Sequence, residues 1–429
     1  MSKLALLGGT PTISGPLPPY RSLGEAERRA VLEVIDSGCL SGFYGSPGDE
    51  FYGGPKVRAF EAMWRESCRT RHAISVNSAT SGLIAAMGAV GIGPGDEVIV
   101  PATTMSATAV ACLFYGGIPV FADIEDETFC IDVASVEAAI GPRTRAIIAV
   151  NLFGHPAKLA ELRELADSRG IYLVEDAAQS PLSFEAGRRA GTIGHIGVFS
   201  LNYHKHIHTG EGGFCVTDDE GLAKRLSLIR NHAENSAEWL GIDDATNMVG
   251  MNLRMTELGA AVGIEQLRAA ETHIGARERV AAALNAAVEG LDGLKPPHVR
   301  DGCRHNYYCW VMRYDAKKTG VSRATFSSAL AAEGFPHFVG YVAPLYRLPL
   351  FRKRHAIGRE GFPFTLSNRR YSDGMCPVAE RLHAEDLVLF EPCAWAVDDA
   401  TLELLAEALR RVHANLPALR AFEQDRAAK

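Results

Sequence analysis

The chain has 429 residues, of which 47% are hydrophobic and 22% charged, and its formal net charge at pH 7 is −7. This composition is that of a soluble globular protein, the acidic balance argues against a nucleic-acid-binding surface, and the length favours two domains over one. Nine cysteines occur singly without a CxxC pair, which predicts reduced thiols and a cytoplasmic location. The apolar run at the N-terminus is too short for a signal peptide.

Short apolar runs alternate with helical patterns in the first part of the chain. Runs rich in valine, isoleucine and phenylalanine predict buried strands at residues 97–101, 118–124, 145–151, 171–176, 196–200 and 212–217. Helices are expected between them, near residues 79–90, 104–115, 132–140 and 157–169. This alternation indicates crossover connections and a mainly parallel sheet.

One stretch, from Val98 to Ala122, has no charged residue. It contains Pro101, Gly116 and Gly117, so we interpret it as strand, loop, helix, turn and strand in a buried core, and not as a membrane span.

The pattern of the sequence changes after about residue 265. Helical stretches rich in alanine and glutamate, at residues 257–290 and 399–415, surround strand-like pieces such as residues 307–314. We therefore predict a large α/β domain over residues 1–265, including the N-terminal segment, and a smaller α+β domain over residues 266–429.

Three histidines flank a lysine in "VFSLNYHKHIHTGEGG", residues 198–213. His204, His206 and His208 alternate and would share one face of a strand, but zinc would need a fourth ligand. No carboxylate or cysteine lies nearby at the usual ligand spacing. We therefore expect ordinary polar side chains here and no metal site.

Lys205 is the more informative residue of this stretch. A lone lysine is usually a surface charge, but this one lies five residues after Ser200, which ends an apolar strand. Burial at the end of a core strand would lower the pKa of the amine and free it to condense with an aldehyde.

A lysine that binds pyridoxal phosphate needs an acid at the ring nitrogen and a nest of N–H groups at the phosphate. Asp176 follows the strand in "IYLVEDAAQS", at the sheet end where α/β proteins bind ligands. Thr80 and Ser81 begin the apolar helix of "SVNSATSGLIAAM", where the helix dipole favours an anion. Simple helix capping is the alternative for both stretches, but the three signals in this order predict a pyridoxal phosphate site.

The lysine stretch resembles the signature of the DegT/StrS-type sugar aminotransferases, which are fold type I pyridoxal phosphate enzymes. The resemblance covers nearly the whole chain and includes "GPGDEVIVPATTMSATA", "LVEDAAQS", "NLRMTELGAAVGIEQL" and "CPVAERL". It implies a large domain with a mainly parallel mixed sheet flanked by helices, and a smaller α+β domain at the C-terminal end. It also implies a homodimer with shared active sites and small-molecule substrates.

The resemblance further implies a role for individual residues. Lys205 would form the imine with the cofactor, Asp176 would pair with the ring nitrogen, and Gln179 would lie near the ring hydroxyl. The phosphate would be held by the backbone of Ala79, by Thr80 and Ser200, and by Asn252 from a neighbouring subunit. Met105 stands where relatives stack an aromatic ring, and Asn151 stands where histidine is common.

The implied reaction transfers an amino group from glutamate or glutamine to a keto-sugar, most often a nucleotide-linked one. A keto-cyclitol is the alternative acceptor. Some relatives carry histidine in place of the lysine and remove a hydroxyl group, so Lys205 favours transfer over a sugar dehydratase. A non-enzymatic regulator would have lost Lys205 or Asp176. A nicotinamide reductase is not expected, because "GAVGIGPGDE" follows a helix and precedes a strand, the reverse of the dinucleotide fingerprint.

Overall fold

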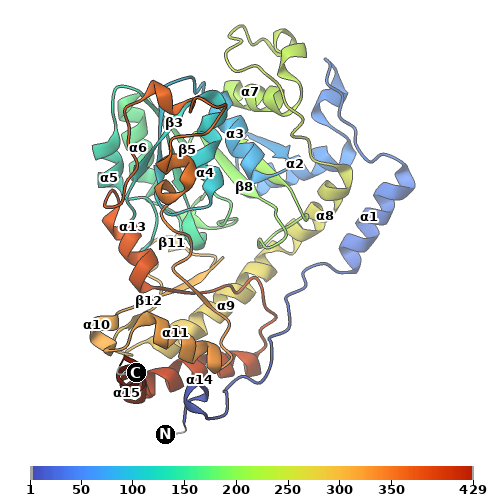
Figure 1. Cartoon of the computed structure of the whole chain (residues 1–429). Coiled ribbons are helices and arrows are strands. Elements are labelled where there is room, and N and C mark those ends of the chain that lie inside the picture. Colours follow the sequence, from blue (N-terminus) through green and yellow to red (C-terminus); the bar gives the residue numbers. More distant parts are fainter. Residues whose placement is uncertain (1–2, 428–429) are drawn as a thin grey trace.

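The computed structural model describes residues 3–427, and its largest sheet, in the upper half of Figure 1, has seven strands. The strand order is β1-β9-β8-β5-β4-β2-β3. The strands are β1 (His72–Val76), β2 (Glu97–Pro101), β3 (Ile118–Ala122), β4 (Thr144–Val150), β5 (Tyr172–Asp176), β8 (Ile196–Ser200) and β9 (Gly213–Thr217). Only β9 runs antiparallel to its neighbours, which confirms the predicted mainly parallel mixed sheet.

Helices cover this sheet at the positions that the alternating pattern predicts. They are α3 (Ala79–Ala89), α4 (Ser106–Val110), α5 (Val133–Ala139) and α6 (Leu159–Arg169). Helix α7 (Glu220–Arg230), which follows β9, was not predicted. The predicted helix over 104–115 is shorter, because its second half, Ala111–Tyr115, is a 3-10 helix. Two further helices, α1 (Glu25–Ser37) and α2 (Pro55–Cys68), and strand β1 were not predicted. In β1, the polar residues His72 and Ser75 interrupt the apolar run.

A second, antiparallel sheet has the order β10-β12-β14-β13. Its strands are β10 (Leu294–Lys295), β12 (Trp310–Tyr314), β13 (Phe338–Val339) and β14 (Leu387–Phe390). The predicted strand over 307–314 begins later than expected, because Tyr307 has a left-handed backbone with φ of 53°. A small third sheet joins β6 (Phe184–Glu185), β7 (Arg188–Arg189) and β11 (Cys303–Arg304).

The remaining helices lie in the second half of the chain. The predicted helical stretch 257–290 is two helices, α8 (Glu257–Arg268) and α9 (Ala270–Val288), which meet at Ala269. The others are α10 (Ala316–Thr319), α11 (Arg323–Ala332), α12 (Pro349–Arg352), α13 (Pro377–Arg381), α14 (Asp399–Ala414) and α15 (Leu416–Ala427). None of the helices in residues 3–427 has the length and apolarity needed to cross a bilayer.

The second sheet lies between two hydrophobic cores. Leu387 and Leu389 of β14 pack in the core of the large sheet, whereas Val388 and Phe390 pack in the second core. The alternation is that of a strand buried on both faces. The N-terminal residues Leu4, Ile13 and Leu17 also pack in the second core, and the predicted division at residue 265 stays a prediction.

The N-terminal segment is held in place by one buried carboxylate. Glu333 accepts hydrogen bonds from the backbone N–H groups of Ala5 and Thr12 at 2.8 and 2.9 Å. Arg411 of α14 donates to the same carboxylate at 2.9 Å. The start of the chain therefore lies against α11 and α14, close to the C-terminal end (Figure 1).

Candidate active site

The predicted site residues meet where the parallel strands end. Asp176 is the last residue of β5 and Ser200 is the last residue of the adjacent strand β8. Lys205 lies in the turn after β8, where its backbone N–H donates to the carbonyl of Asn202 at 2.9 Å. The carboxyl edge of the sheet is the usual ligand site of such folds.

Asp176 is buried, with 4% of its surface exposed. Its Oδ2 accepts a hydrogen bond from the hydroxyl of Thr108 at 2.8 Å, and its Oδ1 accepts one from the N–H of Ala178 at 3.2 Å. Burial raises the pKa of Asp176, while the hydrogen bond from Thr108, the one from Ala178 and the charge of Lys205 oppose that rise. A carboxylate in this setting is suited to a cationic partner such as a protonated ring nitrogen. Thr108 of α4 was not predicted.

The neighbouring carboxylate, Glu175, has a structural role. It is fully buried and accepts hydrogen bonds from the N–H groups of Gly191, Ile193 and Gly194 at 2.5 to 2.6 Å. The side-chain amide of Asn151 donates to it at 3.2 Å. Asn151, which departs from the family pattern, therefore pairs with Glu175 and not with Asp176.

The amine of Lys205 lies over an aromatic ring. Its Nζ is 4.3 Å from the centroid of the Tyr308 ring. In the described part of the chain, Nζ has no hydrogen bond or ion pair. Burial lowers the pKa of Lys205, and the charge of Asp176 acts in the opposite direction. A partly desolvated, unpaired amine near Asp176 is available to react with a carbonyl group.

The three histidines around Lys205 have separate surroundings. His204 is exposed, His206 is buried with its Nε2 2.9 Å from the carbonyl of Asn306, and His208 contacts the hydroxyl of Ser22 at 2.7 Å. Burial lowers the pKa of His206 to about 3, so this ring is neutral and Nε2 donates to the carbonyl. Within residues 3–427, no three His, Cys, Asp or Glu side chains form a group that could hold a metal ion.

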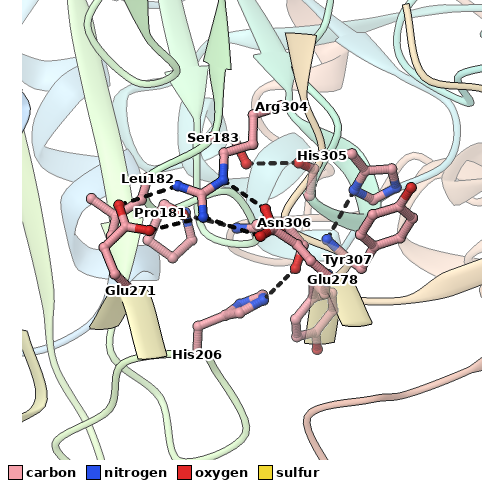
Figure 2. A network of polar contacts seen from close by, with 12 residues as sticks. Pro181, Leu182, Ser183, His206, Glu271, Glu278, Arg304, His305, Asn306 and Tyr307 are labelled. Atoms are coloured by element: carbon pink, nitrogen blue, oxygen red, sulfur yellow. Dashed lines mark hydrogen bonds and ion pairs between the residues drawn. The ribbon is translucent and has the colours of Figure 1, made fainter. Parts of the chain in front are cut away.

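Asn306 joins the lysine turn to two other segments at the strand ends (Figure 2). Its side-chain amide donates to the carbonyl of Pro181 at 2.9 Å, and its N–H donates to the carbonyl of Gly154 at 3.3 Å. The Asn306 side-chain oxygen accepts from the N–H of Tyr308 at 3.3 Å. Gly154 is required here, because a Cβ on it would lie 1.9 Å from that oxygen. Asn306 was not predicted, and it fixes the positions of Tyr308 and the lysine turn together.

Gln179 follows Asp176 by three residues and has a fixed amide. Its Oε1 accepts from the N–H of Phe153 at 2.6 Å, and its Nε2 donates to the hydroxyl of Tyr341 at 3.1 Å. The side chain is buried at this edge of the sheet, and its place near a cofactor ring stays a prediction. Tyr341 was not predicted.

The first turn of α3 lies directly against the ends of β8 and β9. Gly213 pairs with Ser200, and a Cβ on Gly213 would come within 2.8 Å of the backbone nitrogen of Ala79. Thr80 is exposed beside it, and the hydroxyl of Ser78 accepts from the N–H of Ser81 at 3.1 Å. This places free N–H groups, a helix N-terminus and the Ser200 hydroxyl side by side, a cradle that suits a phosphate. With Lys205 and Asp176, the set fits pyridoxal phosphate.

Two predicted residues lie at the surface of this chain. Met105 is 60% exposed at the N-terminus of α4, and Asn252 is exposed with its Oδ1 accepting from Arg254 at 2.8 Å. The ring contact of Met105 and the phosphate contact of Asn252 in a neighbouring subunit stay predictions.

Known proteins resemble this chain over most of its length. A model of the DegT/DnrJ/EryC1/StrS aminotransferase family matches residues 45–388. The L-glutamine:2-deoxy-scyllo-inosose aminotransferase of Streptomyces kanamyceticus is 33% identical over 428 residues, covering 96% of this chain and 97% of that protein. The GDP-perosamine synthase of Caulobacter vibrioides is 36% identical over 290 residues, covering 67% and 74%.

A solved structure supports the same relationship. DesI, crystallised in the presence of its TDP-sugar product, is 30% identical and superposes with a TM-score of 0.80, covering 98% of this chain and 99% of that chain. The agreement over both cores confirms the fold predicted from the resemblance.

Proposed function

Because this chain belongs to the DegT/DnrJ/EryC1/StrS aminotransferase family, we propose that it transfers an amino group from glutamate or glutamine to the ketone of a sugar, with pyridoxal 5′-phosphate as cofactor. The observation that carries the proposal is that an unpaired amine, Lys205, lies within the electrostatic range of a buried carboxylate, Asp176, at the sheet edge that also faces the N-terminus of α3.

Each of these groups would have a distinct task. The cofactor, when bound, supplies an electron-withdrawing ring that stabilises negative charge on a substrate carbon. Asp176 would keep a proton on the ring nitrogen, Gln179 would lie beside the ring, and Ala79, Thr80 and Ser200 would hold the phosphate. Lys205 would hold the cofactor through its aldehyde carbon, and its freed amine would act as the general base that moves a proton from the donor carbon to that former aldehyde carbon. The presence of Lys205 supports transfer of the amine over loss of a hydroxyl.

The acceptor is a nucleotide-linked keto-sugar or a keto-cyclitol. The inosose aminotransferase is similar over 96% of this chain, which keeps the cyclitol as a second candidate beside the nucleotide-linked sugars named for the GDP-perosamine synthase and DesI. The basic residues after Tyr341 also have partners within the chain. Arg347 and Arg352 both pair with Asp373 at 2.7 Å, so their charge is partly neutralised within the chain.

We further propose a cytoplasmic homodimer with shared sites. Large apolar side chains are exposed on α1, on the loop after it, before α4 and between α7 and α8: Leu32, Ile35, Leu40, Tyr44, Met105, Trp239 and Val249. Such side chains suit a contact between subunits. The nine cysteines are all free thiols, which is in keeping with a reducing compartment.

Isotope transfer tests the reaction. The purified chain is given glutamate or glutamine labelled with ¹⁵N in the transferred amine, together with a keto-sugar or inosose, and the product is analysed by mass spectrometry. We expect labelled amine in the product and none from a Lys205→Ala variant, while a Lys353→Ala variant, changed at an exposed lysine, behaves as the wild type. Undiminished turnover by Lys205→Ala would refute the proposal.

Subunit mixing tests the shared sites. Lys205→Ala and Asn252→Ala are each expected to lose at least 90% of activity, about 1.4 kcal/mol of transition-state stabilisation or more. When the two are unfolded and refolded together, mixed dimers would hold one intact site and restore about a quarter of wild-type activity. No recovery would show that Asn252 does not serve the neighbouring subunit.

A further inference from the structure

The Lys205 amine lies over the face of the Tyr308 ring. Nζ lies 4.3 Å from the ring centroid, and the tyrosine is 6% exposed. Burial strongly raises the pKa of Tyr308, so the phenol is neutral and its attraction for a cation comes from the ring face. The other titratable groups around the amine are Asp176 from β5, Cys309 beside β12, Glu391 and Cys393 after β14, and the flanking His204 and His206.

The backbone of Tyr308 is held beside the lysine turn. The N–H of Tyr308 donates to the side-chain oxygen of Asn306, and the backbone carbonyl of Asn306 accepts from His206, the residue after the lysine. Asn306 thus contacts both the backbone of Tyr308 and the lysine turn, and it fixes their positions relative to each other. Tyr307 is kept in a left-handed conformation, and its ring stacks on His305 at 4.0 Å between centroids (Figure 2). Backbone strain of this kind persists only where the surroundings enforce it, and it is concentrated at functional sites.

Opposing effects act on the protonation of the Lys205 amine. Burial disfavours the ammonium form, and Nζ has no hydrogen-bond acceptor in residues 3–427 to offset that cost. Asp176 already accepts hydrogen bonds from Thr108 and Ala178, and in the proposed function its charge is shared with the cofactor ring. A lysine that takes up and releases a proton in every half-reaction needs a further group that stabilises the ammonium without binding it covalently.

We propose that Tyr308 is a catalytic residue whose ring face holds the ammonium of Lys205 whenever that amine is not bonded to the cofactor. The proposal rests on the proposed function of Lys205. The Lys205 nitrogen receives a proton from the donor carbon, and the Tyr308 ring retains the resulting ammonium. The proton then passes to the carbon that is protonated in the same half-reaction, so the amine is neutral again at the end of the step.

Chemical labelling of Lys205 in the full-length chain freed of cofactor tests this contact directly. Acetic anhydride reacts only with the neutral amine, and peptide mass spectrometry measures the labelling rate of Lys205 against that of exposed Lys353 in the same sample. Tyr308→Phe keeps the ring and should label within about twofold of the wild type. Phenylalanines with increasing numbers of ring fluorines, introduced at position 308, keep the shape but withdraw charge from the ring face.

We expect labelling of Lys205 to accelerate with each added fluorine, because loss of the attraction to the ring face favours the neutral amine. At a pH where the amine is mostly protonated, the rate should rise about fivefold for the fully fluorinated ring. Labelling of Lys353 should not change. Equal Lys205 rates for all fluorinated rings would overturn the proposal. The measurement needs neither cofactor nor substrate, so it stands apart from the ¹⁵N-transfer assay: loss of the labelling trend refutes the ring contact, and turnover without Lys205 refutes the function.

Discussion

The hydroxyl of Thr108 is predicted to keep Asp176 ionised. It donates to Oδ2 of Asp176 at 2.8 Å, and both side chains are buried. Thr108→Val keeps the shape of the side chain and removes the donor. A hydrogen bond to a charged group contributes about 1.5–3 kcal/mol, which is roughly 10- to 100-fold in the ionisation equilibrium of the carboxyl group.

The sign of the pH effect follows from burial. Burial already raises the pKa of Asp176, and the bond from Thr108 is the largest opposing contribution. Without that bond the carboxyl group takes up a proton at higher pH, so the acid limb of kcat/KM should move to higher pH. At pH 6 the loss in kcat/KM should be about tenfold or more, with a smaller loss at pH 8.5.

Thr104 provides the matched control. Its hydroxyl lies 3.1 Å from that of Thr108, is equally buried, and does not bond the carboxylate. Thr104→Val should shift the acid limb by less than a third as much. The assay is kcat/KM for the amino donor between pH 5.5 and 9, with thermal unfolding to confirm equal folding. An unmoved acid limb in Thr108→Val, or an equal shift in Thr104→Val, would contradict the reasoning.

Two further substitutions test the framework of the site. Glu175→Gln replaces an acceptor of three backbone N–H groups by an amide that must turn a donor toward them. We expect the free energy of unfolding, measured with urea, to fall by about 3 kcal/mol or more. A loss below about 1 kcal/mol would show that these hydrogen bonds are dispensable. Gly213→Ala inserts a Cβ 2.8 Å from the backbone nitrogen of Ala79, so cofactor affinity should fall at least tenfold by absorbance titration, about 1.4 kcal/mol. Gly275→Ala, in α9 with open space around it, is the control and should leave that affinity unchanged.

The sequence predicted those parts of the site that are local in the chain. Lys205, Asp176 and the turn before α3 stand at the ends of apolar runs, so strand periodicity and residue type were enough to find them. Thr108 and Asn306 were missed because their partners lie 68 and 100 residues away, at Asp176 and His206, and a buried Thr or Asn carries no local signal.

Asn151 shows a second limit of prediction from the sequence. The resemblance assigns no partner to this departure from the family pattern, and the structure places the amide on Glu175, where it helps to hold the loop after β7. Glu175 and Asp176 are adjacent on β5 and therefore point to opposite faces of the sheet. Only the structure shows which of the two has a structural role and which lies at the candidate site.

The anchoring of the first residues by Glu333 and Arg411 bears on how the protein is made. Leu4, Ile13 and Leu17 emerge from the ribosome well before the surface that receives them, which is formed by residues from Val280 to Leu419. Because a domain core closes only when all its segments are present, these leading residues must wait, exposed, until almost the entire polypeptide has been translated. A bulky fusion partner placed ahead of them would compete with that final docking step.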